Sequence, residues 1–232
     1  MTIEAAPLDR RHRRRQETIE EVLDHAVQIM AEDGVAGLSL GEIARRMGIR
    51  PPSLYVYFPS KHALYDALFK RGWELLLAAM EESLTTDPVE GDDLVALLTD
   101  AGQRFAQWSI EHLAYAQLLI WRPVPGFQPS QDAYQPAVAL TDLSRRRFAL
   151  LQQRGLIRPD ADVDLLYRQW TILVAGVVSQ QLSNAPDEPF ATGQFTTQIP
   201  ALAAMFAAHH ANPPRARART TTPARRGHAG NR

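Results

Sequence analysis

The sequence contains no cysteine. This absence excludes disulfide bonds, thiolate-bound zinc, iron–sulfur clusters and any cysteine nucleophile. A long apolar run is also missing, because the longest uninterrupted one, near 172–178, is far shorter than the roughly 20 residues that a membrane helix needs. The first residues contain no apolar core of signal-peptide length. We therefore expect a soluble, cytoplasmic protein with no membrane partner.

Strict alternation of apolar and polar residues, which marks a half-buried strand, does not extend over a useful length. Apolar residues instead recur at helical spacing, as in 17–33, where Ile19, Val22 and Ala26 share one face. A proline-rich stretch at 122–136 is the one long irregular loop that we expect. The sequence therefore predicts an all-α protein. Beyond residue 88 the predicted helices are 92–112, 114–121, 136–154, 162–183 and about 194–209.

The net charge of −1 hides a segregation of charge along the chain. Residues 1–71 carry a formal charge of +1, residues 72–211 carry −8, and the tail 212–232 holds six arginines and no acidic residue. Basic tracts beside a folded module are a footprint of nucleic-acid binding. The tail lacks apolar periodicity, so we expect a disordered, solubilising extension, with non-specific attraction to DNA as the alternative.

The segment 37–58 has the pattern helix, short glycine turn, helix. Ser39 and Glu42 have the S-x-x-E spacing of a capping box, and Gly48 follows two helical turns later. The next helix begins at Pro51 and Pro52, because prolines are tolerated in the first turn of a helix. This is the layout of a helix-turn-helix, whose second helix enters the DNA major groove with its N-terminal residues.

Other residues mark where the neighbouring helices end and meet. Gly34 is predicted to end the first helix, Pro59 to stop the helix that begins at the two prolines, and Ser60 to cap a fourth helix. Ile49 and Leu54 are expected to be the buried contacts that fix the angle between the two short helices.

The residues that then face outward carry groups that DNA recognition uses. Arg50 can bond a guanine edge or a phosphate, Pro51 can meet a thymine methyl group, and tyrosine hydroxyls can donate to phosphates. Lys61 lies in the first turn of a helix, where a cation opposes the helix dipole, so a phosphate partner explains it better. Taken alone, the same residues fit half-buried tyrosines and a solvated surface lysine more simply. The predicted DNA-contacting set is Arg50, Pro51, Ser53, Tyr55, Tyr57 and Lys61.

Residues 15–71 resemble the TetR family of bacterial transcriptional regulators. The resemblance is carried by an amphipathic first helix ending in AEDG, by LSLGEIARRMGI and by PPSLYVYFPSKHALYDAL. The family signature LY-x-x-F-x-x-K stands here at 54–61. The consecutive prolines depart from the family, which usually has a small polar residue before the signature. They remove two N–H donors, which argues against backbone-mediated contacts at these positions.

The resemblance implies a three-helix DNA-binding head, a helical ligand-binding and dimerisation body, and repression at a palindromic operator relieved by a small molecule. It implies DNA-backbone contacts for Tyr55, Tyr57 and Lys61, and groove-facing positions for Arg50, Pro51 and Ser53. The expected division of the chain is 1–14 as a disordered basic arm, 15–60 as the DNA-binding domain, 61–211 as the ligand-binding and dimerisation domain, and 212–232 as the tail.

Large aromatic residues on successive helices of the body suggest an apolar cavity with a few polar groups. Ordinary core packing explains any single one of them better, but as a set they predict a pocket for a largely hydrophobic or aromatic effector. The predicted pocket residues are Phe105, Trp108, His112, Leu118, Trp121, Phe148, Gln169, Trp170 and Leu173.

The last two helices are apolar and rich in small residues, notably at 171–179 and 201–208. Such faces are too apolar for solvent and too small to fill a core alone, so they suit close contact between helices. We predict a homodimer through about 162–183 and 194–209, joined as a two-fold four-helix interface.

Signals of other functions are weaker. Residues 37–41 match the G-x-S-x-G nucleophile elbow, but a helix and not a strand precedes them, and Ser39 is explained as a helix cap. The seven histidines are scattered, and the acidic run at 160–164 lacks the Gly and Glu of an EF-hand. We predict no catalytic site, no metal site and no cofactor. The alternatives are a helical small-molecule-binding protein that no longer reads DNA and, less favoured, a helical hydrolase using Ser39.

The run RRHRRR at 10–15 lies directly before the first helix. A solvated arm and an arm that adds phosphate or minor-groove contacts explain it about equally well.

Deletion of residues 1–13 tests the second interpretation. If these arginines contact DNA, fewer counterions are released on binding, and the dependence of log K on log salt becomes flatter. Fluorescence anisotropy at several salt concentrations measures this slope, and an unchanged slope would contradict a DNA-contacting arm.

Overall fold

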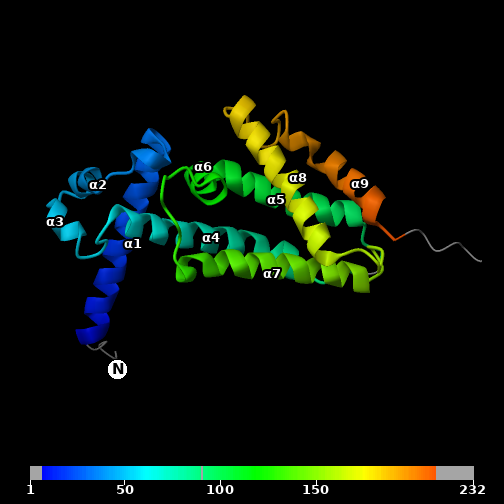
Figure 1. The fold of residues 1–232 in the computed structure, drawn as a ribbon, viewed down its shortest axis with the longest axis horizontal. Helices are drawn as coiled ribbons and strands as arrows, with labels where there is room; N and C mark the ends of the chain where they lie inside the picture. Colours follow the sequence, from blue (N-terminus) through cyan, green and yellow to red (C-terminus); the bar gives the residue numbers. More distant parts are fainter. Residues whose placement is uncertain (1–6, 90, 213–232) are drawn as a thin grey trace, which may run out of the picture.

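The computed structural model of the chain describes residues 7–89 and 91–212. Figure 1 shows an all-helical molecule, as predicted, with a small head at one end and a larger helical body beside it. Within the described ranges the only β pairing is an isolated bridge between Ile157 and Ala211. The elements are α1 (Pro7–Asp33), η1 (Val35–Gly37), α2 (Leu40–Arg46), α3 (Pro51–Leu54), α4 (Lys61–Thr85), α5 (Leu94–Glu111), α6 (Leu113–Ala116), η2 (Gln117–Trp121), α7 (Gln131–Gln153), α8 (Val163–Asn184), η3 (Thr196–Gln198) and α9 (Ile199–His210).

The first helix is longer than the sequence predicted. Residues 7–14, expected to belong to a disordered arm, are helical and continue into the rest of α1. Arginine has a high helix propensity, and extending a helix that is already nucleated adds one hydrogen bond per residue. Gln16 also donates to Glu20 across one turn at 3.1 Å. Apolar periodicity missed this segment because its side chains are exposed from residue 10 onward and pack on no core.

Part of the disorder prediction lies outside the described residues, namely positions 1–6 and 213–232. Asn212, the first residue of the predicted tail, is described, and its backbone N–H donates to the carbonyl of Leu156 at 3.0 Å.

The predicted start of α7 is also wrong. The helix begins at Gln131 and contains Pro136, so the preceding loop is shorter than expected. The Ser130 hydroxyl accepts from the N–H of Ala133 at 3.1 Å and donates to Asp66 on α4 at 2.7 Å. Lys70 on α4 pairs with Asp132 at 2.7 Å. These contacts hold the first turn and compensate for the hydrogen bond that the proline cannot donate.

Two more helices are shorter than predicted. α3 ends at Leu54, and residues 55–57 form turns instead of continuing the helix. α9 begins at Ile199 and not near 194, because the backbone N–H groups of Phe195 and Thr196 bond the buried Gln181 side chain at 3.0 and 3.3 Å.

The helix ends in the head confirm most of the predicted turn chemistry. Gly34 and Gly48 adopt left-handed φ angles of 76° and 67°, which glycine adopts without the steric cost that a Cβ brings. Ser60 caps α4, since its hydroxyl accepts from the N–H of Ala63 at 3.0 Å. The capping box does not form, because Ser39 makes no side-chain bond to α2 and Glu42 pairs with arginines instead.

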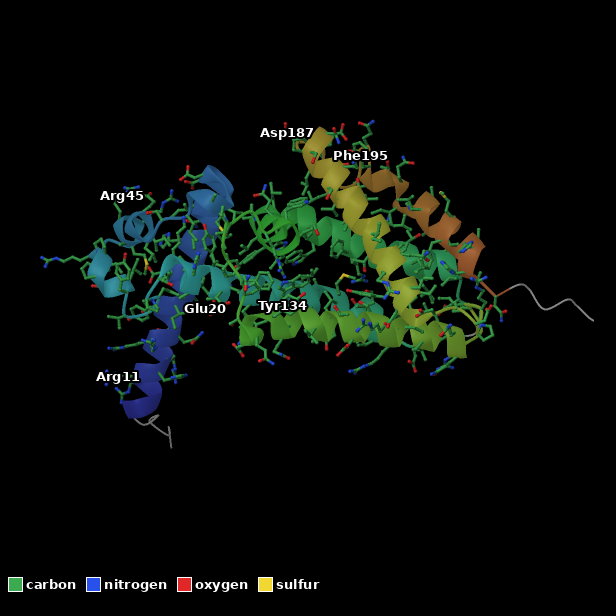
Figure 2. All side chains as sticks on the ribbon, in the orientation of Figure 1. Arg11, Glu20, Arg45, Tyr134, Asp187 and Phe195 are labelled. Atoms are coloured by element: carbon green, nitrogen blue, oxygen red, sulfur yellow. The ribbon has the colours of Figure 1, made fainter. Side chains whose placement is uncertain are left out.

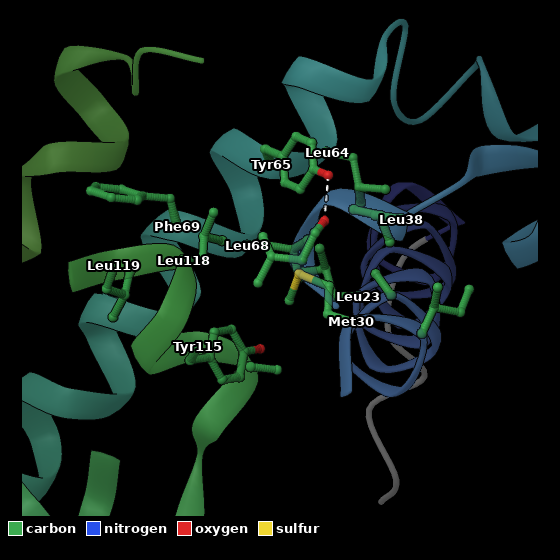
Figure 3. Close-up of a cluster of buried hydrophobic side chains, with 14 of the residues drawn as sticks. Leu23, Met30, Leu38, Leu64, Tyr65, Leu68, Phe69, Tyr115, Leu118 and Leu119 are labelled. Atoms are coloured by element: carbon green, nitrogen blue, oxygen red, sulfur yellow. Dashed lines mark hydrogen bonds between the residues drawn. The ribbon is translucent and has the colours of Figure 1, made fainter. Parts of the chain in front are cut away.

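A single apolar core runs through the head and into the body. Figure 3 shows Leu23 and Met30 of α1 meeting Leu64 and Leu68 of α4, with Leu118 from the body on the same cluster. α4 therefore belongs to both parts: its first turns complete the head, and its later turns pack on α5 and α7.

The body continues this core with α4, α5 and α7, which lie side by side in Figure 1, and with α8 and α9 across α5. Two further apolar clusters fill the space between α5, α7, α8 and α9. Gly102 allows close approach here, because a Cβ at this position would lie 3.0 Å from Ile199 and from Trp170. Over the described residues, no helix is long and apolar enough to span a membrane.

The Tyr65 hydroxyl, fully buried, donates to the carbonyl of Val35 at 2.6 Å and ties α4 to the turn after α1. Its burial raises the pKa of Tyr65 to about 12, so the hydroxyl keeps the proton that it donates.

Tyr65→Phe is expected to lower the free energy of unfolding by about 1–3 kcal/mol, because it leaves the buried carbonyl of Val35 without this donor. Urea denaturation at fixed protein concentration measures the change. Tyr134→Phe is the matched control, since Tyr134 is exposed. Equal stabilities of the two variants would contradict a structural role for the Tyr65 hydrogen bond.

Candidate DNA-contacting head and body cavity

The two short helices of the head cross closely, as a helix-turn-helix requires. Ala44 is fully buried where α2 meets α3, and the chain leaves α2 through a bond from the N–H of Ile49 to the Ala44 carbonyl at 3.0 Å. Leu54 and Phe58 are buried beneath the second helix and its following turn. Leu54 is thus a core contact as predicted, while Ile49 is only partly buried.

The opposite side of this segment is exposed. Five of the six predicted DNA-contacting residues have exposed side chains, and only Tyr57 is half-buried. Tyr55 is 52% exposed although it is a large aromatic residue. The guanidinium of Arg15 lies 5.1 Å from the centre of the Tyr57 ring, so the basic part of α1 and the recognition segment are neighbours. The five exposed residues are Arg50, Pro51, Ser53, Tyr55 and Lys61.

Lys61 opens α4, where the helix dipole disfavours a cation. Its ammonium group donates to the carbonyl of Ala36 at 3.0 Å and lies 5.5 Å from the centre of the Tyr65 ring. These contacts hold the Lys61 ammonium beside the turn between α1 and α2 while the side chain stays exposed.

A small ion-pair network fixes α2 against α1. Glu42 bonds Arg45 at 2.7 Å and Arg46 at 2.9 Å, and Arg46 reaches Glu32 of α1 at 2.6 Å. These hydrogen bonds from the two arginines lower the pKa of Glu42 to about 2. Arg45 extends from the exposed surface of α2 (Figure 2). Sequence reasoning missed this network because it assigned Glu42 to a capping box.

The body contains a partly open cavity of about 300 Å³ between α4, α5, α7 and α8. Phe105, Phe148 and Trp170 line it, as the sequence analysis proposed. The wall is otherwise mostly aliphatic and aromatic, with a few polar groups on α7 and α8. Wall residues that the prediction missed include Trp73, Met80, Leu97, Ala101, Tyr134, Leu140, Thr141, Ser144, Arg147 and Tyr167.

Four of the other predicted pocket residues belong to packing contacts away from the cavity. Trp108 is buried and stacks on His112 with ring centres 4.9 Å apart. Leu118 is part of the core shared with the head. Trp121 is partly exposed and donates to the Ser179 hydroxyl at 3.3 Å.

Gln169 and Leu173 lie on a second hollow, between α8 and α9. Helical spacing identifies an inward face, but it does not say which of several neighbouring helices that face meets.

The polar cavity residues on α7 do carry a sequence signal. Thr141, Ser144 and Arg147 recur at a spacing of three residues, which places them along one stripe of the helix. They were missed because a polar stripe on an amphipathic helix normally faces solvent.

The outer faces of α8 and α9 expose large apolar side chains. Ile172 is 70% exposed and Met205 is 68% exposed, and both border the hollow between the two helices. Both residues fall in the segments that the sequence analysis assigned to dimerisation.

The described residues contain no group of three or more His, Cys, Asp or Glu side chains that could hold a metal ion. Ser39 lies between the 3₁₀ turn η1 and α2, so no strand leads into the G-x-S-x-G match.

Comparison with known proteins identifies relatives of the head and of the whole fold. Residues 22–68 match the family model of bacterial regulatory proteins of the tetR family. The HTH-type transcriptional regulator UidR of Escherichia coli K12 is 28% identical over 169 residues, which cover 71% of this chain and 81% of UidR. The HTH-type transcriptional repressor KstR2 of Mycobacterium tuberculosis is 29% identical over 154 residues, or 64% of this chain and 73% of KstR2.

A solved structure of a protein of unknown function from Rhodococcus sp. RHA1 has the same fold. It superposes with a TM-score of 0.69 at 22% identity and covers 83% of this chain and 95% of that one. Together with the helix-turn-helix head and the helical body, these matches show that the chain belongs to the TetR family of bacterial regulatory proteins and is a DNA-binding transcriptional regulator.

Proposed function

We propose that the protein is a homodimeric repressor that binds a palindromic operator and is released from it by a small, largely apolar ligand. The observation that carries this proposal is the exposed surface of residues 50–57, which presents Arg50, Ser53 and Tyr55 and is held on the buried contacts of Leu54 and Phe58. The Tyr55 side chain is exposed, and the ring of Tyr57 lies beside the guanidinium of Arg15.

In this proposal, α3 enters the major groove with its N-terminal end. Arg50, Pro51 and Ser53 face base edges, while Tyr55, Tyr57 and Lys61 contact phosphates on either side. Lys61 is close to the N-terminal N–H groups of α4, and a phosphate there would meet both the ammonium group and the positive end of the helix dipole.

The apolar outer faces of α8 and α9 are the proposed dimer interface. Exposed side chains such as Ile172 and Met205 would be removed from water by the same faces of a second copy. Two-fold symmetry then sets two recognition helices about 34–36 Å apart, or somewhat more, which requires a palindromic operator.

The proposed effector site is the cavity of the body. α4 lines it with Trp73, Met80 and Leu84, and the first turns of the same helix complete the core of the head. A ligand that fits only one orientation of α4 would shift the population between DNA-competent and incompetent spacings of the two heads.

Two alternatives make different predictions. A protein that has lost DNA recognition would bind ligand but show no preference for any DNA, although its contact residues are present. A hydrolase using Ser39 would turn over ester substrates and lose that activity in Ser39→Ala.

Tyr57→Ala is expected to weaken binding to the DNA upstream of the protein's own gene about tenfold or more, since it removes a phosphate contact and the ring beside Arg15. Fluorescence anisotropy at several salt concentrations measures the affinity. Val89→Ala, in the loop after α4 where Val89 is 68% exposed, is the control and should bind as the wild type does. Equal, weak binding of all three proteins to operator and unrelated DNA would argue against the proposed head.

Ile172→Glu is expected to shift the protein from dimer to monomer at micromolar concentration, because it places a charge in an apolar interface. Light scattering measures the mass. Val89→Glu is the matched control, as Val89 is 68% exposed in the loop after α4 and far from α8 in sequence. A wild-type monomer, or an Ile172→Glu dimer as stable as the control, would contradict this interface.

A further inference from the structure

The cavity wall is apolar along most of its length, with one buried cation among its residues. Arg147 lines the cavity and is only 8% exposed. A guanidinium has five N–H donors and keeps its charge in proteins. Burying a charged group costs free energy unless it is paired with an opposite charge or hydrogen-bonded. The partners of Arg147 therefore indicate whether its role is structural or ligand-binding.

Arg147 has one hydrogen-bond partner among the described residues, the carbonyl of Thr86 at the end of α4. No carboxylate of the described part of the chain forms an ion pair with it, in contrast to its neighbour Arg145, which pairs with Asp164 at 2.8 Å. The bond to Thr86 satisfies a carbonyl at a helix C-terminus, which is a structural role. It uses one donor of the five.

The described acidic residues whose charges act on Arg147 have other partners. Asp87, Asp92 and Asp100 raise the pKa of Arg147, whereas burial, the larger effect, lowers it. Asp87 pairs with Arg154 at 3.5 Å, Asp100 pairs with Arg104 at 3.0 Å, and Asp92 accepts from the N–H of Val89 at 2.8 Å. The described residues therefore balance the charge of Arg147 only in part.

The shape of the wall constrains the rest of a ligand. Tyr134 and Arg147 both line the cavity and lie thirteen residues apart on α7, which corresponds to about 20 Å along the helix. Tyr134 lies at the end of α7 that is nearer the head (Figure 2), whereas Arg147 bonds the carbonyl of Thr86, directly after α4. The wall between them is formed by apolar residues such as Met80, Ala137 and Leu140, with the Thr141 and Ser144 hydroxyls beside them.

We propose that the cavity takes an elongated amphiphile, an apolar chain that ends in a carboxylate, with the carboxylate bound by Arg147 and the chain directed toward Trp73 and Tyr134. This inference rests on the proposed function, in which the same cavity holds the effector. A carboxylate matches the planar fork of the guanidinium and supplies the charge that the wall lacks. The hydroxyls of Thr141 and Tyr167, 3.1 Å apart, add polar groups to the wall about halfway between Tyr134 and Arg147.

Dodecanoate and dodecan-1-ol test the proposal, because they share the chain and differ in the terminal group. Binding to the full-length protein is followed by quenching of tryptophan emission below the concentration of micelle formation, since Trp73 and Trp170 both line the cavity. The wild type is expected to bind dodecanoate at least about tenfold more tightly than dodecan-1-ol, because hydrogen bonds to a charged group are the stronger ones. Equal affinities would overturn the proposal.

Arg147→Gln should abolish this preference, and Arg147→Lys should keep part of it, since lysine retains the charge and loses the fork. Arg146→Gln is the matched control, because Arg146 is the next residue on α7 and is exposed. A preference retained by Arg147→Gln would contradict the assignment of Arg147. If Arg147→Gln does not fold, the affinities of the wild type for dodecanoate and dodecan-1-ol still test whether the cavity prefers a carboxylate.

Anisotropy of operator DNA in the same samples separates this inference from the proposed function. An Arg147-dependent preference for dodecanoate that releases the operator supports both. The same preference without release supports the ligand class and contradicts the effector role. Release by other ligands, with equal affinities for the acid and the alcohol, leaves the proposed function standing and overturns the carboxylate site.

Discussion

The packing of α4 is the constraint on which the rest of the structure depends. Its first turns bury Leu64, Tyr65 and Leu68 against α1 and the turn that follows, and Tyr65 adds the hydrogen bond to Val35. Its later turns form one wall of the body cavity. Because protein interiors are packed densely, such a helix cannot tilt on one side without disturbing the other. The helix therefore provides a physical link between the cavity and the head.

The arginines of the head and Arg147 of the body have different surroundings and therefore suit different anionic partners. In the head, Glu42, Arg45 and Arg46 are near the surface and tie α2 to α1, while Arg50 and the arginines at 10–15 remain exposed. In the body, Arg147 is buried in an apolar wall with a single carbonyl partner among the described residues. Exposed arginines suit a solvated polyanion, whereas a buried one suits a single anionic group that is desolvated with it.

The exposed apolar faces of α8 and α9 complete this arrangement at the far side of the body. Among the described residues, none covers the outer sides of Ile172 on α8 and Met205 on α9. Phe206, the residue after Met205 on α9, is instead buried against Phe148 and Trp170. A helix with two apolar sides buries only one of them in the monomer. The second side is the proposed dimer contact, and it would fix where the two heads lie relative to each other.

The sequence by itself determined the helical fold, the helix-turn-helix and the positions that face outward from it. These features depend on local signals: apolar spacing, the left-handed glycines 34 and 48, and the cap at Ser60. Only the tertiary structure decided which helix faces meet. Packing between distant segments placed Trp73 and Arg147 on the cavity wall and left Trp108 and Leu118 in other contacts. Contacts with α4 also set the start of α7 at Gln131, and Arg46 links Glu42 to Glu32 of α1. Periodicity records that a face is buried, but the partner of that face is set by long-range packing.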